Sequence, residues 1–353
     1  MKKSKTFFAC AMLAALASCS NDHVLSQQSP TPSDPDVINI VAASSKPATR
    51  VAVTGNDLQD TQFADNEKIN VYLYEHNGNL GSSDKTFVDN PYVYTVSSGG
   101  SVGEKNLTKD GALYFPINGK SVDAYAFYPA LSDDTKYNIK SGTEEFSVAT
   151  NQSDIKDYRK SDLMYGTNLW NTSSKGYSSS EPGTAKGNKV QLHFRHLLTK
   201  IVVKLVPGDG FTPDLLSGAR IKLFDAKPKA NITVSKSGID VRLDGETNAP
   251  DGGYDLGTYD SQGNAAIIIP QAITTGKKFI EIALSGSHSG VKYIYNLQNT
   301  DGDDNSSMTF ASGNQYTYKL TLSAGNVVVV STEIVGWNEQ TEIPGNAEPE
   351  QQP

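Results

Sequence analysis

The segment Val190-Gln191-Leu192-His193-Phe194-Arg195-His196 decides the fold class, because apolar residues occupy every second position at its start. In an extended strand the side chains of Leu192 and Phe194 face one way, and the polar residues between them face the other. Residues 197–206 follow directly and form the longest apolar-rich segment outside the N-terminal region. The pattern predicts a half-buried strand that leads into the core of a β-sheet.

Similar short runs recur along the chain, and helical periodicity is hard to find. The 30 Gly residues suit turns, and the 17 Tyr residues suit half-buried sheet faces. We therefore predict an all-β chain of two tandem β-sandwiches. The expected strands lie at 37–42, 51–54, 68–74, 92–96, 112–116, 122–128, 146–149, 190–194, 197–206, 220–224, 230–234, 241–243, 265–269, 279–284, 291–297, 315–322 and 326–334.

The first eighteen residues are organised as an export signal. Three lysines within residues 2–5 precede an apolar run at 7–17, which is too short to cross a bilayer as a mature helix. Leu16-Ala17-Ser18-Cys19 then resembles a bacterial lipobox, the site at which signal peptidase II cuts before a lipid-bearing cysteine. We predict a lipoprotein that is held in the outer membrane through Cys19. The alternative is an ordinary secretory signal that happens to contain a cysteine.

Cysteine usage and charge restrict the possible partners. The only cysteines are Cys10, inside the signal, and Cys19, so no disulfide can form within the exported chain and the fold must rest on its hydrophobic core. The formal net charge is −8, and Lys and Arg are thinly spread. Because phosphate binding needs clustered positive charge, we expect no nucleic-acid partner.

No catalytic or metal-binding constellation stands out in the sequence. His193 and His196 are three residues apart on a strand, so they point to opposite faces and could not easily share one ion. We interpret His196 as a structural residue at the junction between the two sandwiches. The acidic turn at 301–305 lacks the spacing and the distal Glu of a calcium-binding EF-hand loop, so we interpret it as a hairpin tip. We predict no enzyme activity, no cofactor and no bound metal.

Several segments, in order along most of the chain, resemble the fimbrillin family of Bacteroidales pilins and pilus-like lipoproteins. The most specific are Asp162-Leu163-Met164-Tyr165-Gly166 and the segment at 190–198. The others are the lipobox at Cys19, Ala48-Thr49-Arg50, Asp65-Asn66-Glu67 followed by Ile69-Asn70-Val71-Tyr72, Phe127-Tyr128-Pro129, and Ile334-Val335-Gly336-Trp337.

The resemblance implies two transthyretin-like sandwiches and assembly by protease-triggered strand exchange. In that family the exported lipoprotein is cut after an Arg that follows the first strand. The matching residue here is Arg50, and Val51 would become the new N-terminus. An Arg-specific protease would thus remove the lipid together with the first strand. Arg159, in a polar segment, is a competing site, and the alternative is that Arg50 is an ordinary linker residue of a lipidated monomer.

The implied organisation has five parts. They are a signal peptide at 1–18, a lipidated tether with a removable strand at 19–50, sandwiches at 51–188 and 189–345, and a disordered tail at 346–353. The removable strand contains Val37, Ile38, Ile40 and Val41. A polar stretch at 168–188 is interpreted as a long surface loop beside the domain boundary.

A sandwich that lost this strand would expose unpaired backbone groups and an apolar groove, which a strand from another subunit could fill. Refilling would bury roughly four to six apolar side chains at about 1.5 to 3 kcal/mol each. The candidate donor strand contains Val327, Val328, Val329, Val330 and Ile334, which are β-branched and close to the C-terminus. The alternative is that this run is the last core strand of the second sandwich.

These features predict a structural subunit of a cell-surface fimbria. Its partners would be other pilin subunits, in a homo- or heteropolymer that mediates adhesion at the outer membrane and cell surface. The alternative is a lipid-anchored adhesin or tip protein that binds a glycan or a host protein and does not polymerise.

Overall fold

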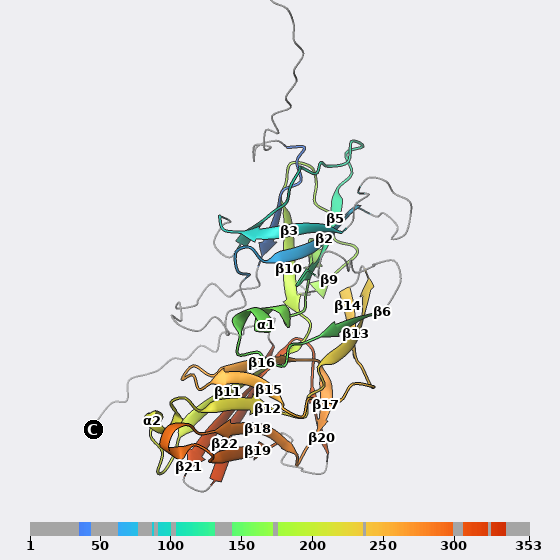
Figure 1. The fold of residues 1–353 in the computed structure, drawn as a ribbon. Coiled ribbons are helices and arrows are strands. Elements are labelled where there is room, and N and C mark those ends of the chain that lie inside the picture. Colours follow the sequence, from blue (N-terminus) through green and yellow to red (C-terminus); the bar gives the residue numbers. More distant parts are fainter. Residues whose placement is uncertain are drawn as a thin grey trace, which may run out of the picture.

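The computed structural model describes residues 35–43, 63–76, 87, 91–99, 104–130, 143–171, 176–235, 238–298, 306–323 and 326–336. These residues are mostly in strands, with short helices only, which confirms the prediction of an all-β chain. In Figure 1 one group of strands occupies one end of the molecule, and two four-stranded sheets occupy the other end. Cys19, Arg50, Val51, the predicted strand 51–54, the acidic turn 301–305 and the tail lie outside the described residues.

Seven strands of the N-terminal half close into a barrel. Around the barrel they are β1 (Ile40–Ala43), β10 (Val190–His196), β7 (Met164–Thr167), β5 (Val122–Tyr128), β2 (Lys68–Glu75), β3 (Tyr92–Ser97) and β4 (Glu104–Thr108), and β4 pairs with β1. One core fills the interior, and every strand of the barrel contributes side chains to it. Ala124 and Ala126 of β5 belong to it.

The C-terminal half contains two four-stranded sheets. One has the order β16 (Asn264–Ile268), β11 (Thr199–Pro207), β21 (Asn314–Ser323) and β22 (Asn326–Gly336). The other has the order β15 (Tyr254–Thr258), β12 (Arg220–Leu223), β18 (Lys278–Ala283) and β19 (Lys292–Asn296).

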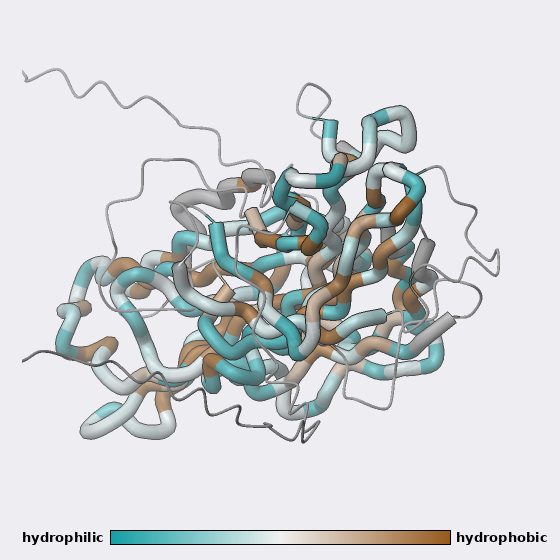
Figure 2. Tube along the Cα trace, turned by 90° about the horizontal axis from the view of Figure 1, so that it is seen from above, coloured by the Kyte–Doolittle hydropathy of each residue, from teal (hydrophilic) through white to brown (hydrophobic). Residues whose placement is uncertain are grey.

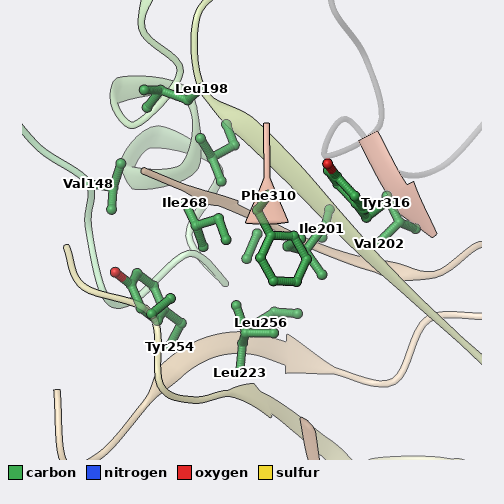
Figure 3. Close-up of a cluster of buried hydrophobic side chains, with 14 of the residues drawn as sticks. Val148, Leu198, Ile201, Val202, Leu223, Tyr254, Leu256, Ile268, Phe310 and Tyr316 are labelled. Carbon is green, nitrogen blue, oxygen red and sulfur yellow. The ribbon is translucent and has the colours of Figure 1, made fainter. Parts of the chain in front are cut away.

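Buried side chains from both C-terminal sheets meet in a second core, among them Ile201, Leu223, Leu256 and Ile268 (Figure 3). This core continues onto the outward face of the barrel, where Tyr125 and Phe127 of β5 join it. Strand β5 is therefore buried on both faces and ties the two halves of the chain together. Figure 2 shows hydrophobic and hydrophilic residues interspersed along the chain.

Smaller elements complete the fold. A three-stranded sheet contains β14 (Gly238–Leu243), β13 (Lys229–Ser235) and β6 (Thr143–Ser147). Two further sheets have two strands each: β17 (Gln271–Thr274) with β20 (Ser307–Phe310), and β8 (Trp170–Asn171) with β9 (Gly176–Tyr177). The helices are α1 (Ile155–Lys160), α2 (Pro213–Leu216) and the 3₁₀ turn η3 (Gly286–His288).

Most of the predicted strands are present, and the differences have local causes. The run at 112–116 forms a single bridge, between Val37 and Tyr114, rather than a strand. The sequence does not predict strand β4, because only Leu107 among its residues is buried, and apolar and polar residues do not alternate along it. The segment 168–188, interpreted as a loop, carries the short pair β8–β9.

The sheets exchange strands across the boundary predicted at residues 188 and 189. Strand β10, grouped with the C-terminal sandwich from sequence, is hydrogen-bonded into the barrel because Leu192 and Phe194 complete the barrel core. Conversely, β6 pairs with β13 of the C-terminal half. In hydrogen-bonding terms the chain passes from the barrel to the C-terminal sheets between His196 and Thr199, while the boundary between domains stays a prediction.

Candidate functional site

The strand predicted to be removable lies between two strands of the barrel wall. β1 pairs parallel to β10, with Ile40 opposite Val190, and antiparallel to β4, with Ile40 opposite Leu107. It has only four residues, and all of them are buried. The barrel is therefore closed by a short segment that precedes all the other described strands in the sequence.

The side chains of β1 and of the residues before it fill the barrel. Ile38, Ile40 and Ala42 belong to the barrel core, as expected for every second residue of a strand. Val37 and Val41, on the alternate positions, are 7% and 2% exposed. The four apolar residues named from sequence thus all lie inside the protein, two of them in the barrel core.

Backbone contacts extend the pairing beyond β1 towards the N-terminus. The Ile38 N–H donates to the Leu113 carbonyl at 2.8 Å, and the Phe115 N–H donates to the Asp36 carbonyl at 2.8 Å. On the other side, the Val190 N–H donates to the Asn39 carbonyl at 2.8 Å. The groove that holds this segment is therefore longer than β1 and includes the irregular segment after β4.

A side-chain contact links the two neighbours of β1 to each other. Gln191 Nε2 of β10 donates to Glu104 Oε1 of β4 at 2.9 Å, although β1 lies between these strands. Both side chains are polar, and the hydrogen bond between them is exposed to solvent. It can therefore open at little free-energy cost.

The opposite edge of β10 pairs with β7, and there the two most specific motifs of the sequence meet. Phe194 lies directly opposite Gly166. A Cβ atom on Gly166 would lie 2.7 Å from the Phe194 ring, so only glycine leaves room for it. Arg195 stacks its guanidinium over the Tyr165 ring at 5.6 Å.

His196 closes the same edge. Its Nδ1 lies 2.8 Å from Asp162 Oδ1, and the His196 side chain is 3% exposed. This agrees with the structural role expected from sequence. His193 faces elsewhere and stacks on Trp170, with its pKa lowered by burial. The two histidines do not converge on one site.

Glu67, just before β2, ties the barrel to helix α1. Its carboxylate accepts hydrogen bonds from the Tyr128 hydroxyl and from the Ala64 N–H, each at 2.8 Å. Arg159 Nη1 of α1 lies 3.8 Å from Glu67 Oε1. Burial raises the pKa of Glu67 despite these contacts. The cluster is a structural clasp at this end of the barrel.

The candidate donor residues lie in the other half of the molecule. Val327, Val328, Val329, Val330 and Ile334 belong to β22, which is the edge strand of its sheet and pairs antiparallel with β21. Ile334 is 46% exposed. The structure therefore does not bring the donor candidate next to β1 within one chain.

The described ranges contain neither a metal-binding cluster nor a membrane-spanning helix. No three His, Cys, Asp or Glu side chains there gather closely enough to hold a metal ion. Nor does any helix there have the length and apolar character needed to cross a bilayer. Most of the described groups with a shifted pKa are buried or half-buried tyrosines, such as Tyr94 and Tyr165. Burial raises the pKa of these tyrosines because it disfavours the phenolate.

These features define a class of protein: an all-β chain whose barrel is completed by a short strand from the N-terminal region. A family model described as fimbrillin-like matches residues 49–337. The chain belongs to this fimbrillin-like family.

A curated relative named "Putative fimbrium subunit Fim1C", from Bacteroides uniformis, is 25% identical over 346 residues, covering 96% of this chain and 95% of the relative. Among solved structures, a "putative cell adhesion protein" from Bacteroides uniformis superposes with a TM-score of 0.59 at 19% identity, covering 87% of this chain and all of that one. One from Bacteroides ovatus gives 0.56 at 15% identity, covering 86% and 99%. The structural likeness shows a shared fold.

Proposed function

We propose that the chain is a subunit of a cell-surface fimbria that mediates adhesion. It is exported as a lipoprotein whose lipid is on Cys19, and it polymerises with other pilin subunits. Assembly starts when an Arg-specific protease cuts after Arg50 and the chain begins at Val51. The observation that carries the proposal is β1, a four-residue strand that completes the barrel and precedes this cut in the sequence.

The energetics of β1 explain why a lost strand must be replaced. Its departure would leave one edge of β10 and one edge of β4 without backbone partners. Burial of Val37, Ile38, Ile40 and Val41 is worth about 6 to 12 kcal/mol at about 1.5 to 3 kcal/mol each, which is comparable to the stability of a whole domain. An open barrel is therefore a strong acceptor for a strand of another subunit.

The competing site at Arg159 is a poor protease substrate. Arg159 lies in helix α1, its side chain is 25% exposed, and it faces Glu67. A protease needs an accessible, extended segment, which a folded helix does not offer. This supports Arg50 as the processing site.

We further propose that β22 is the strand donated to the next subunit. β22 pairs only with β21 among the described strands, so its release would break one ladder of backbone hydrogen bonds rather than two. Its run of β-branched residues suits a position inside a barrel wall. We assign Val327 to Val330 and Ile334 as the residues that fill the groove of the next subunit.

The test is the N-terminus of the protein on cells. Mass spectrometry of shear-released material is expected to show Val51 as the first residue in a high-mass ladder. If all surface material instead starts at lipidated Cys19 and stays monomeric, polymerisation is excluded. The chain would then be an anchored adhesin.

A further inference from the structure

A pocket of about 630 Å³ opens on the barrel next to the segment that follows β4. It is lined by Glu75, Phe87 and the residues from Ala112 to Asn118. Ile117 is fully exposed at this pocket, and Tyr114 is 55% exposed. Ile117 and Tyr114 line the same pocket, and a contiguous exposed apolar patch of this kind is typical of an interaction surface.

The pocket is continuous with the groove of β1. Its wall contains Leu113 and Phe115, whose backbone groups pair with Ile38 and Asp36. The wall runs antiparallel to the β1 segment, as the Val37–Tyr114 bridge shows. Residues 116–118 therefore lie past the N-terminal end of β1, where a longer strand in the same groove would continue.

The polar groups of the pocket already have partners. The Glu75 carboxylate accepts from Lys120 Nζ at 2.8 Å, and Asn118 Nδ2 lies 3.4 Å from its Oε1. The remaining lining is apolar or aromatic. An apolar side chain on an extended peptide fits this chemistry better than a charged or strongly polar ligand.

We propose that this pocket is the docking point at which the incoming strand of a second copy of this chain first binds, before β1 has left. The inference rests on the proposed function and adds a step to it. The end of the incoming strand occupies the pocket, and its remaining residues then displace β1 one pair at a time towards Ala43.

The physical reason for such a step is the burial of β1. After the cut, the β1 fragment is held by two backbone ladders and by side chains inside the barrel core, so it leaves slowly by itself. A strand that is already bound beside it exchanges each broken hydrogen bond for a new one. The pocket is open while β1 is in place, which is the condition that this route requires.

The experiment uses the full chain made without lipid (Cys19→Ser), cut after Arg50, with fibre growth followed by light scattering. Ile117→Glu places a charge at the pocket without disturbing the core, and Ala112→Trp fills the pocket. We expect both variants to slow fibre growth and release of the β1 fragment by about tenfold, the factor expected from losing burial of one apolar side chain. The matched control is Val291→Glu, which charges an apolar residue that is 42% exposed in the other half of the molecule.

The outcomes separate the two proposals. Growth of both pocket variants at the wild-type rate, after equal cleavage measured by mass spectrometry, would overturn the docking step and leave the proposed function intact. Absence of any fibres from the cut wild-type chain would overturn both. Equal slowing by Val291→Glu would also overturn the docking step, because it would show that any added surface charge retards growth.

Discussion

The two edges of β10 are held in different ways. Towards β7, the pairing is fixed by specific side-chain contacts: Phe194 over Gly166, and His196 with Asp162. Towards β1, it consists of a short parallel ladder and apolar side chains that enter the core. A ladder and an apolar alternation can be reproduced by many sequences, whereas a ring packed onto a glycine cannot. Under the proposed function, the edge towards β7 stays paired and the edge towards β1 accepts a replacement strand.

The same difference bears on the proposed loss of β1, because the barrel would have to keep its shape without that strand. The contacts between β10 and β7 do not involve β1, so the proposed loss of β1 would leave them intact. Glu67, just before the start of β2, contacts Tyr128 at the end of β5 and Arg159 of helix α1. These contacts also do not involve β1. An acceptor groove that keeps its geometry avoids an ordering penalty when a new strand binds.

The largest effect is expected from Arg50→Ala, which makes the exchangeable edge permanent. Without the cut, β1 stays covalently attached and the groove stays filled, so fibres should be absent. Shear-released material is expected to lack the high-mass ladder. The control is Arg242→Ala, which removes an exposed arginine on β14. A ladder in Arg50→Ala cells would contradict the assignment of the switch.

The next prediction compares Ile40, which the proposed cut would remove from the fibre, with Ile267, which would remain in it. Ile40→Ala should lower the free energy of unfolding of the uncut chain by about 2 to 5 kcal/mol, because it opens a cavity in the barrel core. Ile267→Ala, in the C-terminal core, should have a similar effect. Urea unfolding checks both.

In assembled fibres the two variants should differ. The proposed cut removes Ile40 from the fibre, so Ile40→Ala fibres should dissociate in denaturant like the wild type, while Ile267→Ala fibres stay weakened. Equal weakening of both kinds of fibre would show that β1 remains in place after assembly.

The permanent edge is tested by Gly166→Ala. The new methyl group would meet the Phe194 ring at 2.7 Å, so the ring or the strand must shift. We expect a loss of about 1 to 3 kcal/mol in the free energy of unfolding, the usual range for overpacking. The matched control is Gly245→Ala, where a Cβ atom has no neighbour within 4 Å. Similar losses at both glycines would show that backbone entropy, rather than the close contact, sets the effect.

The sequence predicts the strands better than the partners of those strands. Alternation predicts β10 because Leu192 and Phe194 stand between polar residues. Strands β2 and β5 are mostly apolar runs that are buried on both faces. Alternation could not show that β10 joins the barrel, since pairing depends on residues far away in the chain. The motif around Gly166 was noticed through family resemblance, but its cause, a ring that lies where a Cβ atom would be, is visible only in three dimensions.

The smallest expected effect concerns the clasp at Glu67 and appears in the pH dependence of stability. Burial raises the folded-state pKa of Glu67 above the value of 4.5 for the unfolded chain, so the folded protein binds more protons just above pH 4.5. Stability from this group is therefore present at low pH and is lost as the pH rises through the folded pKa. Glu67→Gln removes the titration, so the wild type should lose stability relative to this variant across that window, measured by urea midpoints. Tyr128→Phe should enlarge the effect, since the Tyr128 hydroxyl favours the charged carboxylate. A wild type that instead gains stability relative to Glu67→Gln as the pH rises would show that the hydrogen bonds to the carboxylate outweigh its burial.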